Sequence, residues 1–331
     1  MAYCAVACRC LNLRLNLRLN AGDAAQKTAS RNTKTMFAKA YSIASCFTLP
    51  VVISSRSDQG ECKSTIGACV VVNRDGWILT SAHLIKEIQR QQDSSMKHSA
   101  YGDEVRKLEQ DTVADKRYRK SKVRTFQRPS KDSVRNHSVW WGRDGAQLRD
   151  LSVLPGADLA LGRLQPFDPD SVAHYPAFKN PATDYAPGRS LCRLGFPFHE
   201  IKPTFDQQKN AFVLPQGAVP LPLFPLEGIF TRVVIAPMPG ADERTPGKFI
   251  ETSSPGLMGQ SGGPIVDAQG VVWALQSHTR HYPLGFSPPV PGQGKSTDKK
   301  EHQFLNVGLG VHAESILQFL TSRKVAHQSA D

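Results

Sequence analysis

The sequence contains no long hydrophobic run, and none of its apolar stretches approaches the roughly 18–20 residues that a membrane-spanning helix needs. We therefore expect no membrane span. The seven cysteines are an odd number and lack the C-x-x-C spacing of a metal or redox site. This pattern predicts a protein without disulfides, bound metal or cofactor, in a reduced compartment such as the cytoplasm.

Acidic residues are scarce near the N-terminus, where Asp23 is the only acid in the first 57 residues. Residues 1–35 carry six Lys/Arg, which predicts a disordered basic tail; a segment for import into an organelle is the alternative interpretation. Residues 86–135 carry fourteen Lys/Arg against eight Asp/Glu and so contribute +6 to the chain total of +12. We expect an acidic partner or a nucleic acid, if one binds, to contact residues 86–135.

The body of the chain has the pattern of a β protein from Ala38 onward. Short stretches rich in Val, Ile and Thr alternate with turns, which predicts strands over residues 48–55, 66–73, 76–82, 137–142 and 147–154. Apolar residues recur with weak helical spacing in residues 86–135, which we call the charged insertion. An amphipathic helix is expected over 313–320. Two further segments are predicted to be loops, the proline-rich 213–228 and the polar 287–301. Predicted strands far outnumber predicted helices, which favours an all-β fold over alternating strands and helices.

One stretch, "GLMGQSGGPIVD" at residues 257–268, places Ser261 between glycines. It fits two designs, the strand-to-helix nucleophile elbow and the serine turn of a β-barrel protease. A serine hydroxyl is a poor nucleophile until a base takes its proton, and that base needs a third group to fix its tautomer. A histidine and a carboxylate are therefore required as well.

His83 and Asp158 are the candidates for these two groups. His83 follows the predicted strand "WILTSA", and Asp158 lies where a turn leads into "LALGRL". Both precede Ser261, whereas the elbow design requires the serine first and a helix after it. The order His, Asp, Ser is that of chymotrypsin-type enzymes, and the elbow interpretation fails.

Three blocks, "GACVVVNRDGWILTSAHLI", "DLALGRL" and "GQSGGPIVDAQG", resemble the motifs of trypsin-like serine proteases. The closest branch is the bacterial Deg-like, or high-temperature-requirement, group, without its C-terminal peptide-binding module. The resemblance spans roughly residues 40–320. It implies two perpendicular six-stranded β-barrels, with a partly helical charged insertion and a C-terminal helix. The expected domains are a protease domain over 36–322, with barrels at 36–170 and 185–322, and a tail at 323–331.

The resemblance also implies roles for individual residues. His83 would act as general base and then general acid, Asp158 would orient it, and Ser261 would attack the carbonyl. The backbone N–H groups of Gly259 and Ser261 would form the oxyanion hole. The backbone of Ser277 would pair with the substrate, and the specificity pocket would have its base near Pro255, with Thr279 and Arg280 on the opposite wall.

The sequence departs from the secreted digestive enzymes at several positions. Ala68 and Leu84 stand where those enzymes have a disulfide beside the histidine. Gln260 replaces an aspartate that pairs with a new N-terminus, which argues against activation by that salt bridge. The absence of an acid at Pro255 argues against selection of Lys or Arg and favours a small or apolar side chain.

The sequence therefore predicts a serine endopeptidase that hydrolyses polypeptides through an acyl-enzyme. The alternative is a catalytically silent trypsin-like module that binds a protein or nucleic acid through its basic segments. Nothing in the pattern indicates an oligomeric state.

Overall fold

The structure is a computed structural model that describes residues 36–111, 115–183, 185–237, 246–285 and 304–330. The chain divides into two units, Met1–Lys34 and Thr35–Asp331, and the description below concerns the second. The predictions for residues 1–35 and 287–301 lie outside the described residues.

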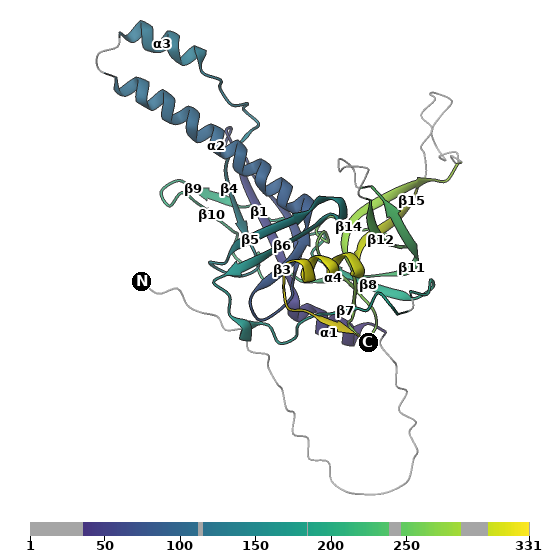
Figure 1. The fold of residues 1–331 in the computed structure, drawn as a ribbon. Coiled ribbons are helices and arrows are strands. Elements are labelled where there is room, and N and C mark those ends of the chain that lie inside the picture. The colour runs from purple at the N-terminus through teal and green to yellow at the C-terminus, as the bar shows by residue number, and fades with distance from the viewer. Residues whose placement is uncertain (1–35, 112–114, 184, 238–245, 286–303, 331) are drawn as a thin grey trace, which may run out of the picture. The chain divides into compact units, whose positions relative to one another are not determined.

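The N-terminal half forms an antiparallel sheet of six strands in the order β4-β1-β2-β3-β6-β5 (Figure 1). Its strands have these bounds: β1 Thr48–Ser57, β2 Cys62–Val71, β3 Trp77–Ser81, β4 Val134–Trp140, β5 Gln147–Leu154 and β6 Leu159–Gln165. The turn predicted at residues 74–76 joins β2 to β3, with Gly76 at φ +82°. The Val- and Ile-rich stretches of β1 and β2 contain consecutive buried residues, so both faces of the sheet are covered there.

The C-terminal half contains six strands that close into a ring in the order β13-β8-β11-β12-β15-β14, because β14 pairs back with β13. Their bounds are β8 Ser190–Gly195, β11 Phe224–Ala236, β12 Gly247–Thr252, β13 Pro264–Val266, β14 Val272–Pro283 and β15 Phe304–His312. Two short strands, β7 Ala177–Lys179 and β16 Gln328–Ala330, extend this sheet in parallel. The predicted all-β, two-barrel fold is confirmed. The segment 323–331, predicted as a tail, thus contributes a strand.

The chain contains a few smaller elements. The 3₁₀ turn η1 Pro155–Ala157 lies between β5 and β6, and η2 Pro169–Ser171 lies in the connection between the two halves. A two-stranded sheet of β9 Thr204–Asp206 and β10 Ala211–Val213 lies between β8 and β11. The predicted loop 213–228 is too long, since β11 begins at Phe224 and pairs with β8. The two prolines at 220 and 222 precede that strand and cannot donate ladder hydrogen bonds, while Pro225 is tolerated inside it.

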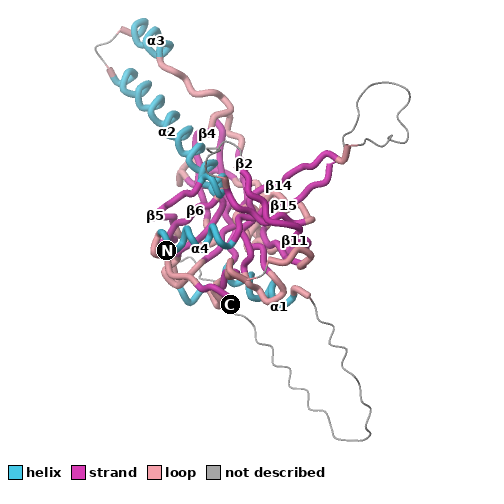
Figure 2. The backbone as a smooth tube through the Cα atoms, turned by 45° about the vertical axis from the view of Figure 1, so that its right-hand side comes forward, coloured by secondary structure: helices cyan, strands magenta, loops and turns pink. Residues whose placement is uncertain are grey.

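Residues 38–47, where the sequence pattern was expected to give strands, form the helix α1, Ala38–Phe47. The expectation was wrong because the buried residues Ala40, Ala44 and Phe47 recur at helical spacing and the segment is rich in alanine. Figure 2 shows α1 and the C-terminal helix α4, Ala313–Ser322, outside the strands. The helix α4 confirms the predicted closing helix.

The charged insertion is mostly helical. Helix α2, Ala82–Gln110, begins directly after β3, and α3 covers Lys116–Thr125 (Figure 1). Only Ala82, Leu84, Ile85 and Gln91 of α2 are buried, so its first part packs on the sheet and the rest is exposed or half-buried. The helix starts four residues before the predicted insertion because its first turn belongs to the protease core. None of the described helices is both long enough and apolar enough to cross a membrane.

Candidate active site

His83 is positioned by the transition from β3 to α2. It is the second residue of the helix, and its backbone N–H donates to Oδ1 of Asp158 at 2.9 Å. Its ring nitrogen Nδ1 lies 2.9 Å from Oδ2 of the same carboxylate. The side chain remains 45% exposed, so the ring reaches solvent while one edge is held.

Asp158 lies at the other side of this contact, directly after η1. It adopts a left-handed backbone conformation, with φ +51°, and its side chain is 2% exposed. Its carbonyl oxygen accepts from the N–H of Ala82 at 3.1 Å, which ties β6 to the start of α2. A carboxylate accepts hydrogen bonds only, so Nδ1 of His83 carries the proton and Nε2 is left as the acceptor. That is the tautomer which a general base requires.

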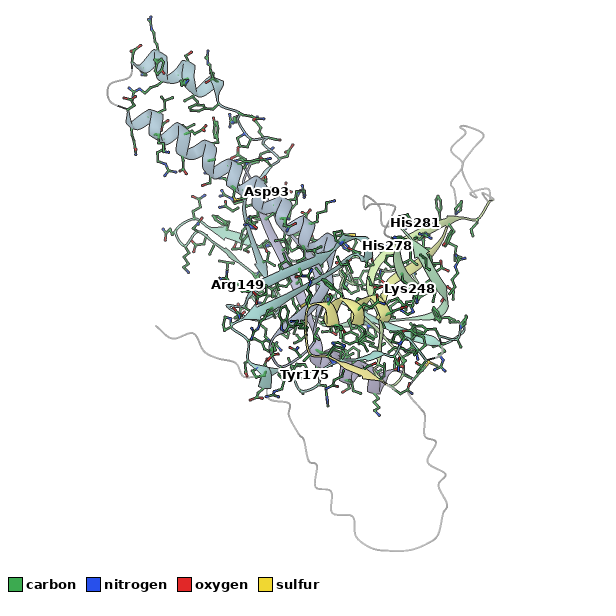
Figure 3. All side chains as sticks on the ribbon, viewed as in Figure 1. Asp93, Arg149, Tyr175, Lys248, His278 and His281 are labelled. Atoms are coloured by element: carbon green, nitrogen blue, oxygen red, sulfur yellow. The ribbon has the colours of Figure 1, made fainter. Side chains whose placement is uncertain are left out.

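Ser277 also binds the buried carboxylate, through its side chain. Its Oγ donates to Oδ2 of Asp158 at 2.5 Å, and Nδ1 of His278 lies 3.0 Å from the same Oγ. Since the hydroxyl proton is directed to Asp158, His278 donates to Ser277. The sequence motifs assign Ser277 a backbone role only and contain no signal for His278, which lies on β14 (Figure 3).

Burial is the main influence on His278 and lowers its pKa below the ordinary value, although the Asp158 carboxylate nearby opposes this effect. His278 is therefore neutral at pH 7, and its Nδ1 proton is available to Ser277. The Asp158 carboxylate thus bonds directly to His83 and, through the hydroxyl of Ser277, is linked to His278.

The turn that carries Ser261 depends on its glycines. Gly259 has φ +95°, and a side chain there would overlap the carbonyl oxygen of Phe196. A non-glycine residue is therefore excluded both by conformation and by space. The carbonyl of Ser261 accepts from the N–H of Ala68 at 2.8 Å, which anchors the turn on the first sheet. Within the described residues, the N–H groups of Gly259 and Ser261 donate to no protein atom.

Gln260 stabilises the same loop from the inside. It is fully buried, and its Oε1 accepts from the N–H of Leu257 at 2.9 Å. The loop is thus held by a contact within itself where the digestive enzymes use an ion pair to a new N-terminus. This contact gives a physical reason for the departure noted in the sequence.

A cleft of about 700 Å³ contains three of the predicted site residues. His83, Gly259 and Ser261 line it, together with Ser64, Thr65, Ile66, Leu84, Glu87, Phe196, Phe198, His199, Glu200 and Met258. Asp158 and Ser277 lie buried behind His83 and do not line it. The structure therefore brings His83, Asp158, Ser277 and Ser261 into one region from segments distant in sequence.

No hydrogen bond joins His83 to Ser261 within the described residues. The hydroxyl near His83 Nε2 is that of Ser81, at 3.4 Å. Ser81 is 2% exposed and does not line the cleft, so a substrate has no path to it. Hydrogen bonds of catalytic groups are often long in unliganded enzymes, and Ser261 remains the accessible hydroxyl.

The predicted specificity residues Pro255, Thr279 and Arg280 are not among the residues that line the cleft. Thr279 Oγ1 donates to the carbonyl of Gly256 at 2.7 Å and so joins the two expected walls. The carbonyl of Pro255 accepts from Nη1 of Arg193 at 2.8 Å. Arg193 was not among the residues predicted from the sequence, because a lone arginine in an apolar strand carries no motif.

The described cysteines form no disulfide. Burial raises the pKa of Cys69 to about 12 and that of Cys192 to about 11, so both thiols stay protonated and unreactive. Leu84 packs against Gly67, where a side chain would overlap it, and this apolar contact occupies the region of the missing disulfide. No group of three or more potential metal ligands occurs in the described part of the chain.

Residues 67–275 match the family described as Trypsin-like peptidase domain. The match covers more than half of the 331 residues, so the chain belongs to this family of trypsin-like peptidases. It is a serine endopeptidase by membership of that family, which confirms the resemblance found in the motifs.

The fold is similar to that of the active form of Rv3671c protease from M. tuberculosis, with 14% identity, a TM-score of 0.45, and coverage of 88% of this chain and 86% of that chain. It is also similar to the HtrA-type protease AlgW with a tripeptide, with 15% identity, a TM-score of 0.45, and coverage of 86% of this chain and 62% of that one. At these scores the likeness carries no conclusion about substrate or partners. A search of curated proteins finds no match for the chain.

Proposed function

We propose that the peptidase acts through a triad of His83, Asp158 and Ser261 and an acyl-enzyme intermediate. The observation that supports this most strongly is the contact of His83 Nδ1 with Asp158, which leaves Nε2 as an acceptor beside the cleft that Ser261 lines. Neutral imidazole with an unprotonated Nε2 can take the proton of a serine hydroxyl.

In the first half of the reaction, Ser261 Oγ attacks the carbonyl carbon of the scissile peptide and its proton passes to Nε2 of His83. The carbonyl oxygen becomes an oxyanion, which the N–H groups of Gly259 and Ser261 stabilise. The intermediate collapses, the C–N bond breaks, and the leaving amine takes the proton from His83. An ester between Ser261 and the acyl group remains.

In the second half, water attacks the ester and gives its proton to Nε2 of His83. The new oxyanion occupies the same position, and its collapse releases the peptide carboxyl group while Ser261 regains the proton. Asp158 keeps its hydrogen bonds from the backbone N–H and Nδ1 of His83 and from Ser277 throughout, and its carboxylate stabilises the imidazolium.

Labelling with a fluorophosphonate tests this proposal, because the reagent reacts only with a serine that its base has activated. We expect the full-length protein to be labelled on Ser261, and Ser261→Ala to be folded and unlabelled. Ser81→Ala is the matched control, since it removes the hydroxyl near His83 Nε2 and should keep the label. A label on Ser81, or no label on folded protein, would contradict the triad.

The same experiment distinguishes the triad peptidase from the second candidate function, a catalytically silent module that binds an acidic partner. That candidate is favoured by α3, which carries six Lys/Arg, no acid and no buried residue. Folded protein that takes no label would support it. Binding of a protein or nucleic acid by the insertion 86–135 stays a prediction, as does the reduced compartment.

A further inference from the structure

Arg193, on β8, is a buried cation that the proposed mechanism does not use. Arg193 is 1% exposed. Among the described residues, no carboxylate oxygen lies within 4.0 Å of its guanidinium nitrogens. Burial lowers its pKa to about 10, so the guanidinium is still charged at neutral pH. A buried charge without a counterion is costly, and such a group persists where the fold or a ligand compensates it.

The guanidinium is fixed to the loop at the predicted base of the specificity pocket. Nη1 donates to the carbonyl of Pro255 at 2.8 Å, and Nη2 donates to Oγ1 of Thr252 at 2.5 Å. Ser254 accepts through its carbonyl, at 3.3 Å, and through its hydroxyl, at 3.2 Å. These acceptors are all neutral, so they orient the cation without neutralising it.

Nη2 of the guanidinium, which donates to Thr252, also lies against the neighbouring strand β15. Gly308 on β15 lies so close that a side chain there would overlap Nη2 of Arg193. Gly308 pairs with Thr279 on β14, and Thr279 donates to the carbonyl of Gly256. The charged group therefore lies between the loop carrying Pro255 and the strand pair carrying Thr279, at the floor of the predicted pocket.

Further polar atoms at this floor have no partner. Nε of Arg193 and Oε1 of Gln276 are buried and make no hydrogen bond within the described residues. The amide of Gln276 lies against Gly256, where a side chain would overlap its Nε2, and that nitrogen makes a single bond, to the carbonyl of His278 at 3.2 Å. An amide nitrogen carries two protons, so Nε of Arg193 and Nε2 of Gln276 are spare donors beside the positive charge, while Oε1 of Gln276 is a spare acceptor.

We propose that the specificity pocket takes an acidic side chain, glutamate or aspartate, from the residue before the scissile bond, with Arg193 as the specificity-determining residue. This inference rests on the proposed function, because it assumes that the peptide is cleaved beside Ser261. The carboxylate supplies the counterion that Arg193 lacks, and to reach it the substrate separates Thr279 from Gly256. A small or apolar preference, expected from the sequence, leaves the buried charge uncompensated.

Binding to the Ser261→Ala protein tests the pocket without requiring turnover. Two product-like peptides identical except for a C-terminal glutamate or glutamine are titrated into the full-length variant at pH 7.5 by calorimetry. We expect the glutamate peptide to bind about 10- to 100-fold more tightly, as is typical of hydrogen bonds to a charged group. Adding Arg193→Gln should abolish this difference, whereas adding Arg149→Gln, an exposed arginine on β5, should leave it unchanged.

Arg193 also holds the loop, so its loss could unfold the pocket; Arg193→Lys, which keeps the charge, is the second variant and should retain part of the preference. Equal affinity for both peptides, tighter binding of glutamine, or no binding of either peptide would overturn the inference. Fluorophosphonate labelling of wild-type protein is scored separately. A labelled Ser261 without a glutamate preference refutes the pocket assignment alone, and a missing label refutes the proposed function.

Discussion

Replacing Ser277 by alanine would remove one of three donors to the buried Asp158 carboxylate. The other two are the ring and the backbone N–H of His83, and the lost bond is the one measured at 2.5 Å. The change would also leave the Nδ1 proton of His278 without its acceptor. Because the Asp158 carboxylate is buried, solvent replaces its lost bond poorly.

Hydrogen bonds to charged groups contribute about 1.5–3 kcal/mol to stability. We therefore expect Ser277→Ala to lower the free energy of unfolding by about 2 kcal/mol, measured by urea titration followed by circular dichroism. If the same bond also orients Asp158 in the transition state, the second-order rate constant of fluorophosphonate labelling should fall by about tenfold or more.

Ser45→Ala serves as the control, because Ser45 is an exposed serine of α1 whose hydroxyl, among the described residues, bonds only to the carbonyl of Ser42. It should change stability by less than about 0.5 kcal/mol. A Ser277→Ala protein with the stability and labelling rate of the wild type would refute the reasoning that this hydroxyl holds the carboxylate.

Two further predictions concern the oxyanion turn and acid stability. Gly259→Ala should leave a folded protein whose labelling rate falls about 100-fold, since the new methyl group overlaps Phe196 and displaces an oxyanion donor; a rate within threefold of wild type would contradict this. Burial lowers the pKa of His312 from 6.5 to about 4. Between these values the unfolded chain binds more protons, so stability should fall by about 3 kcal/mol as pH drops from 7 to 4. Its Nδ1 caps α4 by accepting from Glu314 N–H, and His312→Asn, which can still cap, should lose most of this pH dependence in urea titrations; an unchanged pH dependence would contradict it.

The candidate site could be predicted from the sequence to a large extent. The order of His83, Asp158 and Ser261 along the chain distinguishes the β-barrel design from the nucleophile elbow. Glycine at position 259 by itself indicates a turn of unusual conformation, because few side chains tolerate positive φ. Both signals can be read without the fold, because they depend only on residue types and on their order along the chain.

Other features could not be predicted because they depend on residues brought together across the fold. His278 reaches Asp158 only through the hydroxyl of Ser277, beside a register shift of β14 between Gln276 and His278. The segment of α1 is too short to distinguish a helix from a strand without its packing partners. The direction of α2 is likewise decided by its first turn, which packs on the sheet that carries Asp158.

The sequence by itself determined which residues could perform acyl transfer, because nucleophile, base and carboxylate are chemical types with a required order. Only the tertiary structure decided what surrounds them. Arg193 is an ordinary arginine in a strand until Pro255, Thr252 and Gly308 enclose its guanidinium. Burial and the distance to the nearest carboxylate are properties of the packed chain, and these two quantities make a surface-type residue into the candidate receptor for a substrate charge.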